Sequence, residues 1–281
     1  MESFVADPVA SLGESRLVDW LCTRGSVLVG YSGGVDSTYL AVVAREVLGP
    51  GNVLAVLGRS ASVPNEQSDR ARAVAVERDI PLRIVETGEV SDPRYAANPA
   101  NRCYFCKSVL WDVLVPLARD AGLAAVVDGT NADDTAEYRP GARAAAEQGV
   151  LSPLALAGLT KSDIRALSRA RGLSTWSQPS APCLASRIPY GTPVTPERLS
   201  QVERAEHALR LLGIAGDLRV RHHEDIARVE LEARLIDEWL EPANMNRLAA
   251  AVRSAGFSRV TLDLSGFRSG SLNVLEGIVA A

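Results

Sequence analysis

The amino-acid sequence predicts an α/β protein in which a doubly wound parallel sheet is followed by a smaller α+β unit. Short apolar runs alternate with stretches of helical spacing through roughly the first 180 residues, the pattern of parallel strands joined by helices. A glycine turn follows the first apolar run, and the texture of the chain changes at a proline- and glycine-rich segment. We therefore expect two domains, residues 1–187 and residues 188–281.

The first domain should contain four buried strands, each a short apolar run between helical segments. These runs are residues 26–31, Val53–Leu57, Leu82–Val85 and Ala124–Val127. Helical spacing occurs in residues 14–23, Ser37–Leu48, Pro64–Arg78, Cys103–Arg119 and Thr160–Arg171, the last with Ser162 and Asp163 near its start. In such a sheet, ligands bind at the carboxyl ends of the strands.

The linker Arg187–Pro193, which is rich in proline and glycine, should separate the two textures of the chain. We expect a long helix over Pro196–Leu212, paired strands at Leu218–His222 and Ala227–Leu231, a further helical region and a last strand at Arg259–Leu264. This α+β unit is too short to repeat the first fold.

Composition restricts the class of protein. The chain of 281 residues is 47% apolar and 23% charged, which is typical of a globular protein with a full core. A net charge of -4 argues against a broad basic surface for nucleic acid. No apolar run reaches the roughly 18 residues of a membrane span, and the N-terminus lacks the pattern of a secretory signal. Four cysteines form no dense disulfide framework, so we expect a cytoplasmic, reducing location.

The turn Ser32–Ser37, which reads Ser-Gly-Gly-Val-Asp-Ser, has the composition of a phosphate-binding loop. Gly33 and Gly34 allow positive φ and a close approach of the backbone to a ligand. Successive N–H groups at the start of the following helix form an anion-binding nest, to which Ser32, Asp36 and Ser37 add polar side chains. The turn is not a Walker A loop, because no lysine follows the glycines. The alternative is an ordinary strand–helix turn.

Cys103 and Cys106 lie three residues apart at a predicted helix start, so both thiols share one face. A redox dithiol is one reading, although thioredoxin-like flanks are absent. A structural zinc needs four ligands, and no second pair is present. A chance pair of core cysteines is the remaining alternative.

A third thiol, Cys183, lies in a proline-bounded loop beside the basic Arg187, which favours an exposed thiolate. Three cysteines suit a [4Fe-4S] cluster that keeps one iron open for an exogenous ligand. They equally suit one reactive thiol together with two cysteines that take no part in the chemistry. Cys22, on the first helix, is most simply a buried core residue.

The segment Asp128–Asp134 follows the fourth predicted strand at its carboxyl end. Asp128, Gly129, Thr130 and Asn131 offer carboxylate and small polar groups that can coordinate Mg²⁺ or hold a ribose and adenine. The alternative is a turn and a helix cap, which these residue types also favour.

In the second domain, Arg219 and Arg221 alternate on one strand and share a face, with Glu230 on the neighbouring strand. Arg268 lies among glycines and hydroxyls near the C-terminus. Converging arginines would bind a phosphate or carboxylate, whereas a solvated face with surface ion pairs is the alternative. His207, His222 and His223 have no triad or metal-pair context, and we expect them at the surface.

The loop Ser32–Ser37 resembles the PP-loop of the ATP pyrophosphatases, whose fold is adenine nucleotide alpha hydrolase-like. Nearly the whole chain resembles the LarE family of ATP-dependent sulfur transferases within that superfamily. The resemblance rests on that loop and on Asn98–Lys107, Asp128–Asp134, Pro182–Thr192 and Gly266–Asn273. The strings Cys183–Thr192 and Phe267–Asn273 are the more specific ones.

The resemblance implies sulfur insertion into pyridinium-3,5-biscarboxylic acid mononucleotide, a step in making the nickel-pincer nucleotide cofactor. ATP with Mg²⁺ would activate a carboxylate as an acyl-adenylate, and Ser32–Ser37 would hold the pyrophosphate. Arg219 and Arg221 would bind the substrate phosphate, and Arg268 another phosphate. A homo-oligomer is also implied, with a hexamer as one form and the smaller units near the contacts.

Two sulfur sources follow from the resemblance. Some members carry only the equivalent of Cys183 and surrender its sulfur, whereas others add the pair seen here as Cys103 and Cys106 and hold a [4Fe-4S] cluster. We favour the cluster. Competing classes are a tRNA thiolase, which the acidic balance and the lack of an RNA-binding domain disfavour, an NAD synthetase-like ligase, which leaves the cysteines idle, and a non-catalytic nucleotide- or cluster-binding regulator.

Overall fold

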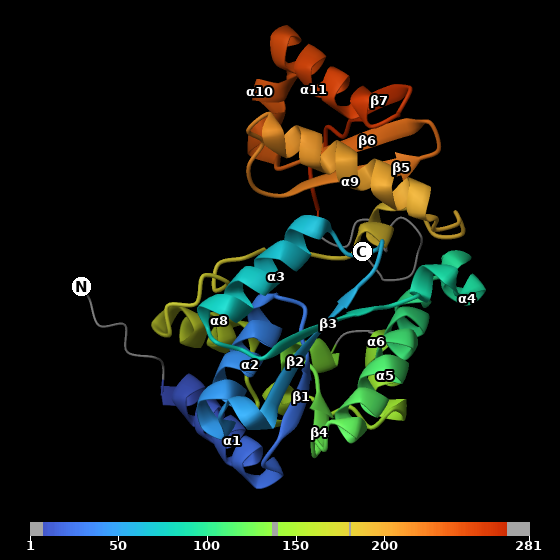
Figure 1. The fold of residues 1–281 in the computed structure, drawn as a ribbon. Helices are drawn as coiled ribbons and strands as arrows, with labels where there is room; N and C mark the ends of the chain where they lie inside the picture. Colours follow the sequence, from blue (N-terminus) through green and yellow to red (C-terminus); the bar gives the residue numbers. More distant parts are fainter. Residues whose placement is uncertain (1–7, 137–139, 180, 269–281) are drawn as a thin grey trace. The chain divides into compact units, whose positions relative to one another are not determined.

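The structure is a computed structural model that describes residues 8–136, 140–179 and 181–268. The chain divides into two compact units. The first comprises Met1–Ser60, Asn65–Glu89 and Asn101–Ala181, and the second comprises Ala61–Pro64, Val90–Ala100 and Pro182–Ala281. Each unit has its own sheet, as the sequence predicted, and Figure 1 labels the strands and most of the helices named below.

The first sheet is parallel throughout and has the strand order β3-β2-β1-β4. Its strands are β1 (Val27–Gly30), β2 (Val53–Arg59), β3 (Leu82–Glu86) and β4 (Ala125–Val127). All four predicted strands are therefore confirmed to within two residues at each end. The central strands β1 and β2 are almost wholly buried, as expected for strands covered on both faces.

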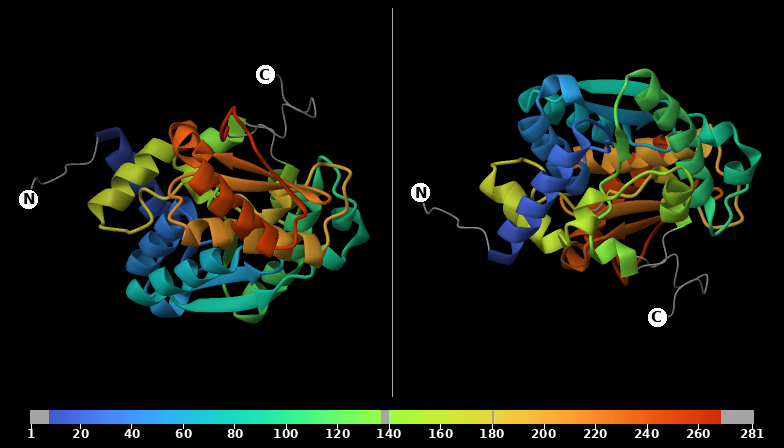
Figure 2. Two further views of the ribbon diagram at one scale, coloured as in Figure 1. Left: turned by 90° about the horizontal axis from the view of Figure 1, so that it is seen from above. Right: turned by 90° about the horizontal axis from the view of Figure 1, so that it is seen from below.

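Helices cover both faces of this sheet, so the predicted doubly wound arrangement is confirmed (Figures 1 and 2). One core joins the sheet to α1 (Pro8–Arg24), α2 (Val35–Leu48), α3 (Asn65–Glu77), α7 (Pro153–Leu156) and α8 (Lys161–Ala170). The other joins it to α5 (Arg102–Asp120) and α6 (Pro140–Glu147). Among the residues described, no helix is long and apolar enough to cross a bilayer.

The strand order places a topological switch point between β1 and β4. The chain leaves β1 through α2 toward β2 and β3, and returns through α5 to pair β4 with the opposite edge of β1. Loops that follow neighbouring strands diverge at such a point and leave a crevice for ligand. The two loops here are Ser32–Ser37 and the segment that begins at Asp128.

The second unit contains a three-stranded mixed sheet with the order β5-β6-β7. The hairpin of β5 (Leu218–His223) and β6 (Ile226–Leu231) is antiparallel, and β7 (Arg259–Leu262) adds in parallel to β6. The helix α9 (Pro196–Leu211) packs against β5 and against α11 (Pro242–Ser254), which follows α10 (Ile236–Leu240). The short helical turns of the chain are η1 (Pro50–Asn52), η2 (Glu89–Ser91), α4 (Pro93–Ala96), η3 (Asp133–Ala136), η4 (Leu184–Arg187) and η5 (Ala233–Leu235).

Two short segments from the first third of the chain belong to the second unit. The buried Asn98, with φ 56°, donates its side-chain amide to the carbonyl oxygens of Ile188, Pro189 and Thr192 at 3.3, 2.8 and 2.9 Å. The Ser62 carbonyl accepts from the amide of Leu184 at 2.8 Å. The segment that the sequence indicated as a linker is therefore held inside this unit by a hydrogen-bonded asparagine.

Candidate active site

The turn after β1 has a backbone geometry that glycine is required to supply. Gly33 has φ 73°, and a Cβ atom on it would lie 2.4 Å from the Cβ of Ala71 on α3. Ser32 and Ser37 face each other across the turn, with their hydroxyl oxygens 3.0 Å apart. The first amides of α2 have no acceptor within the helix and lie at its positive end, so the turn is built to face an anion.

Tyr31 fixes the turn against α3. Its hydroxyl donates to the Ala71 carbonyl at 3.0 Å, and burial raises the pKa of Tyr31, which keeps the phenol neutral and able to donate. Beneath the turn, a Cβ on Gly30 would lie 2.7 Å from the ring of the buried Trp111. The turn is thus held by tight packing from both faces of the sheet.

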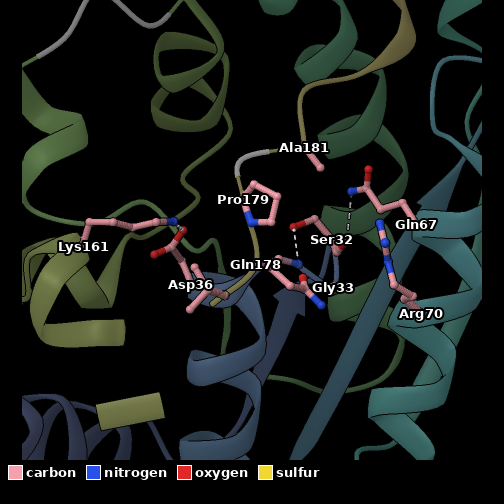
Figure 3. A pocket seen from close by; sticks show the side chains of 11 residues that line it. Ser32, Gly33, Asp36, Gln67, Arg70, Lys161, Gln178, Pro179 and Ala181 are labelled. Atoms are coloured by element: carbon pink, nitrogen blue, oxygen red, sulfur yellow. Dashed lines mark hydrogen bonds and ion pairs between the residues drawn. The ribbon is translucent and has the colours of Figure 1, made fainter. Parts of the chain in front are cut away.

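The turn lines a pocket with a cavity volume of about 240 Å³ (Figure 3). In Figure 3, Gln67 and Arg70 of α3 lie on one side of the turn and Lys161 of α8 lies on the other. Gln67 donates to the Ser32 carbonyl at 3.2 Å. The lining residues are Ser32, Gly33, Gly34, Val35, Asp36, Gln67, Arg70, Lys161, Gln178, Pro179 and Ala181.

Lys161 is a pocket residue that sequence reasoning missed. It is the first residue of α8, next to a capping box in which Thr160 and Asp163 bond reciprocally, so its backbone position is fixed. Its ammonium forms an ion pair with Asp36, and its amide donates to Asp133 at 2.8 Å. The predicted helix start near Ser162 and Asp163 is confirmed. It places the Lys161 ammonium beside the turn Ser32–Ser37, which contains no lysine.

Asp36 has the environment of a carboxylate that is prepared for a further ligand. One oxygen pairs with Lys161, while Oδ1 is buried and has no hydrogen-bond partner among the residues described. A buried carboxylate oxygen is costly unless something binds it. The oxygen therefore fits a divalent cation that enters with a nucleotide.

The loop after β4 meets the glycine turn. A Cβ on Gly129 would lie 2.9 Å from the backbone nitrogen of Ser37, so the two loops are in contact at the switch point. Asp128 accepts from Thr130 at 3.1 and 2.9 Å and from Ser152 at 2.7 Å. The buried Asn131 accepts from the first amides of η3. These are the contacts of a turn and a helix cap, the alternative that the residue types left open.

The described part of the chain holds no cluster of metal-ligating side chains, at Asp36 or at Asp128. Across residues 8–136, 140–179 and 181–268, no group of three or more His, Cys, Asp or Glu side chains is arranged to hold a metal ion. The assignment of Asp128 to Mg²⁺ stays a prediction.

Cys103 and Cys106 lie in the first turns of α5, one helical turn apart. Cys103 is exposed, and Cys106 is half-buried. Cys183 belongs to the second unit, where it precedes η4 and is half-buried. None of the cysteines forms a disulfide. Because the pair and Cys183 belong to separate units, the meeting of the three thiols stays a prediction.

The expectation that Cys22 is a core residue is wrong, because Cys22 is exposed. The stripe of α1 that packs on the core contains Leu17 and Leu21, both completely buried. Cys22 follows Leu21 and is therefore rotated by about 100° around the helix, away from that stripe.

The arginines of β5 are buried, so the alternative of a solvated strand face is wrong. Arg219 and Arg221 are each 6% exposed, and Arg219 faces Glu230 in the register of β5 and β6. Arg221 donates to Glu230 at 2.7 Å. Burial lowers the pKa of Arg219 to about 10, and repulsion from the neighbouring Arg187 adds to the effect. The result is a concentration of buried positive charge.

Arg268 is exposed, and its neighbour Phe267 lies under the Arg219 guanidinium, 4.8 Å from it. The C-terminal motif therefore reaches the arginines of β5 through an aromatic ring. The rest of that motif, residues 269–273, lies outside the described residues.

The expectation that His222 is a surface residue is wrong, whereas His207 and His223 are exposed. His222 is 3% exposed, lies 3.2 Å from Gln201 and packs edge-on against Phe257. Residues 218–222 are all buried, because both faces of β5 are covered. Strand alternation therefore gives no indication of exposure at this position.

Arg187 has a role that its position in the sequence did not reveal. It is 4% exposed and forms a two-point ion pair with Glu206 of α9 at 2.9 and 3.1 Å. Its remaining nitrogen donates to the carbonyl oxygens of Pro182 and Cys183. Glu206, 19 residues away, had no signal in the local pattern.

Comparisons with known proteins agree with this architecture. The NAD synthase family model matches residues 18–96, which span the glycine turn, β2 and β3. Together with the pocket that the turn after β1 lines, the fold defines an ATP-dependent adenylating enzyme of the PP-loop type.

The chain is 40% identical over 261 residues to the pyridinium-3,5-bisthiocarboxylic acid mononucleotide synthase of Lactiplantibacillus plantarum, covering 92% of this chain and 93% of that one. It therefore belongs to the LarE family. An uncharacterized protein of Synechocystis sp. is 46% identical over 246 residues, 88% of this chain and 91% of its own. An uncharacterized protein of Methanocaldococcus jannaschii is 28% identical over 246 residues, 86% of this chain and 91% of its own.

Proposed function

We propose that this enzyme adenylates a carboxylate of pyridinium-3,5-biscarboxylic acid mononucleotide and converts it to a thiocarboxylate. The supporting observation is the similarity over 92% of the chain to a synthase of the bisthiocarboxylic product. A match of 261 residues is longer than either unit alone and therefore extends into both units.

In the first half-reaction, a carboxylate oxygen of the substrate attacks the α-phosphorus of ATP. A P–O bond forms to the carboxylate, the bond to the β-phosphate oxygen breaks, and pyrophosphate leaves. The amides of the Gly33–Ser37 turn would hold the departing pyrophosphate. The Lys161 ammonium would leave its ion pair with Asp36, bind a phosphate oxygen of ATP and stabilise the negative charge that develops on that oxygen.

Asp36 would then be available to Mg²⁺, a Lewis acid that polarises the phosphates when bound. Arg219 and Arg221 would attract the phosphate of the mononucleotide, since buried guanidinium groups bind phosphate strongly. Arg268 would help to bind another phosphate. Gly129, Thr130 and Asn131 would line the nucleotide side of the switch point.

In the second half-reaction, sulfur forms a bond to the acyl carbon and AMP leaves with the bonding electrons. For its source we propose a [4Fe-4S] cluster held by Cys103, Cys106 and Cys183. Two thiols one turn apart at the open end of a helix fit such ligation. When bound, the cluster supplies a sulfide on its open iron. The alternative source is Cys183 itself, left as dehydroalanine.

Two measurements test the function and the sulfur source separately. Release of pyrophosphate that requires both ATP and the pyridinium substrate, together with a thiocarboxylate product detected by mass spectrometry, would support the reaction. Iron and acid-labile sulfide in anaerobically prepared protein, both lost on Cys103→Ala, would support the cluster. Iron-free protein that loses one sulfur from Cys183 per turnover would replace it with the sacrificial mechanism.

The competing classes have distinct outcomes. A ligase of the NAD synthetase type would release pyrophosphate with its own carboxylate substrate, and Cys183→Ala would not affect it. A tRNA thiolase would thiolate RNA, and a regulator would release no pyrophosphate. We also propose a homo-oligomer, which light scattering of the purified protein would establish.

A further inference from the structure

The peptide groups around Cys183 are fixed by the buried Arg187 side chain and by a backbone hydrogen bond. The Pro182 and Cys183 carbonyl oxygens both accept from Nη1 of Arg187, at 2.8 and 3.1 Å. On the other side, the Leu184 amide donates to the Ser62 carbonyl at 2.8 Å. The backbone is therefore held both before and after the residue that carries the thiol.

The Arg187 guanidinium is itself held in one plane. Glu206 binds it through two parallel hydrogen bonds, Nε to Oε1 at 2.9 Å and Nη2 to Oε2 at 3.1 Å. Oε1 of Glu206 also accepts from the Val220 amide at 3.0 Å, which ties the pair to β5. The orientation of the guanidinium is thus set jointly by α9 and β5.

Arg221 supplies a second tie to the same loop. Its guanidinium donates to the Ser186 carbonyl at 2.8 Å and to Glu230 at 2.7 Å. Two arginines, each backed by a glutamate on another element, therefore hold the carbonyls of Pro182, Cys183 and Ser186. Water or a serine hydroxyl could satisfy these carbonyls without placing a charge in the interior.

The Arg187–Glu206 pair is largely buried, with side chains 4% and 16% exposed. Such a pair is a poor means of gaining stability, because the desolvation of the charges offsets most of their attraction. Such a pair is better suited to fixing a geometry, since the planar guanidinium cannot rotate without breaking several bonds at once. What this geometry fixes is the direction of the Cα–Cβ bond of Cys183.

We propose that Arg187, held by Glu206, is a positioning residue that aims the Cys183 thiol at its reaction partner. The inference rests on the proposed function in that Cys183 takes part in sulfur delivery, as ligand or as donor. It does not depend on which of the two holds. Arg187 need not touch the substrate.

The test compares Arg187→Lys and Glu206→Gln with the wild type. Lysine keeps the charge but has neither the planar donor set nor the two-point pairing, and glutamine keeps the shape of Glu206 but removes its charge. Arg204→Lys is the matched control, because Arg204 also lies on α9 and donates to a backbone carbonyl, that of Ala255, at 3.0 Å. Circular dichroism establishes that each variant is folded.

The first readout is thiol reactivity in the folded protein. Iodoacetamide labelling of Cys183, followed by peptide mass spectrometry, is referred to the labelling rate of the exposed Cys22 in the same sample. Loosening the loop should expose the half-buried thiol and raise the Cys183 rate at least about threefold in both variants. Arg204→Lys should leave it unchanged.

The second readout is the rate of sulfur transfer. A displaced thiol should lower that rate about 10- to 100-fold, while substrate-dependent pyrophosphate release in a single turnover and KM for ATP stay near wild type. If both variants keep the wild-type labelling and transfer rates, Arg187 does not position Cys183. If labelling changes although the wild type makes no thiocarboxylate, the positioning stands and the proposed reaction fails.

Discussion

Replacing Lys161 by methionine separates its role in catalysis from its role in stability. Methionine keeps the length of the side-chain stem and removes the ammonium that pairs with Asp36. The backbone amide of residue 161 keeps its hydrogen bond to Asp133, so the start of α8 is preserved. The substitution therefore changes one charge in the pocket.

The cost in stability follows from the exposure of the pair, 37% for the Lys161 side chain and 19% for that of Asp36. Exposed pairs contribute about 0–1 kcal/mol, and breaking a fully buried pair costs about 3–5 kcal/mol. A partly buried pair lies between, at about 1–2 kcal/mol, which would lower Tm by about 2–8 °C in a chain of this size.

The cost in rate should be larger. Loss of one donor aimed at charge that develops in the transition state lowers kcat about 10²- to 10³-fold, or about 2.7–4 kcal/mol. Since the interaction with phosphate would strengthen only in the transition state, KM for ATP should change little. The loss of kcat should therefore exceed what unfolding can explain.

The assay is initial-rate pyrophosphate release at saturating ATP and pyridinium substrate, with thermal unfolding followed by circular dichroism. Lys161→Arg should recover part of the rate because it restores the charge. Arg72→Met, which removes an exposed cation of α3, is the control for net charge. If Lys161→Met keeps kcat within about threefold while Tm falls as expected, Lys161 only balances Asp36, and its catalytic assignment is wrong.

Three further outcomes follow from the structure. Gly33→Ala combines a positive φ with a Cβ 2.4 Å from Ala71, so urea unfolding should show a loss of about 2–4 kcal/mol, and a loss under about 0.5 kcal/mol would contradict that packing. Gly129→Ala directs a Cβ at the Ser37 nitrogen and should raise KM for ATP at least about tenfold, or about 1.4 kcal/mol; an unchanged KM would remove that loop from the site. Burial lowers the pKa of His222 below 6.5 in the folded state, so its contribution to the free energy of unfolding is complete above that pH and falls as the pH drops from 6.5 toward the lowered pKa. His222→Gln should therefore flatten the pH dependence of the free energy of urea unfolding between about 7 and 5. An unaltered slope would exclude His222 as the cause of that dependence.

The fold class and the glycine turn could be read from the sequence because local pattern determines both. Apolar runs of strand length between amphipathic stretches indicate a parallel sheet, and adjacent glycines after Tyr31 indicate a turn with positive φ. The edge of the sheet at which the ligand site lies followed from topology, because a turn after β1 lies at the carboxyl end of that strand. Even the helix start at Thr160–Asp163 carried its capping signature.

Lys161, Arg187 and Asn98 could not be assigned in the same way. Lys161 reaches Asp36 across 125 residues, and Asn98 reaches Pro189 across 91. Partners so distant in sequence are chosen by tertiary packing, and no spacing rule encodes them. Arg187 was visible as a charge beside Cys183, but its use depends on Glu206, which only the packing of α9 brings to it.

The errors at Cys22 and His222 have different origins, because helical periodicity alone separates Cys22 from the buried stripe of α1, whereas the burial of His222 depends on tertiary packing. Exposure depends on which neighbouring elements cover a face, whereas residue type and periodicity describe one element alone. Cys22 is apolar enough for a core but is turned away from the stripe of Leu17 and Leu21. His222 is polar but lies on a strand that is covered on both faces.

The inclusion of Ala61–Pro64 and Val90–Ala100 in the second unit bears on how this chain is made and divided. During synthesis, Asn98 leaves the ribosome well before Ile188, Pro189 and Thr192, whose carbonyl oxygens it binds. The hydrogen bonds of its side-chain amide can therefore form only after residue 192 has been synthesised. A fragment that ends at residue 187 would leave the Asn98 amide without these carbonyl partners, and a fragment that begins at residue 188 would lack Asn98. The second unit is therefore a late product of synthesis, completed only when both halves of the chain are present.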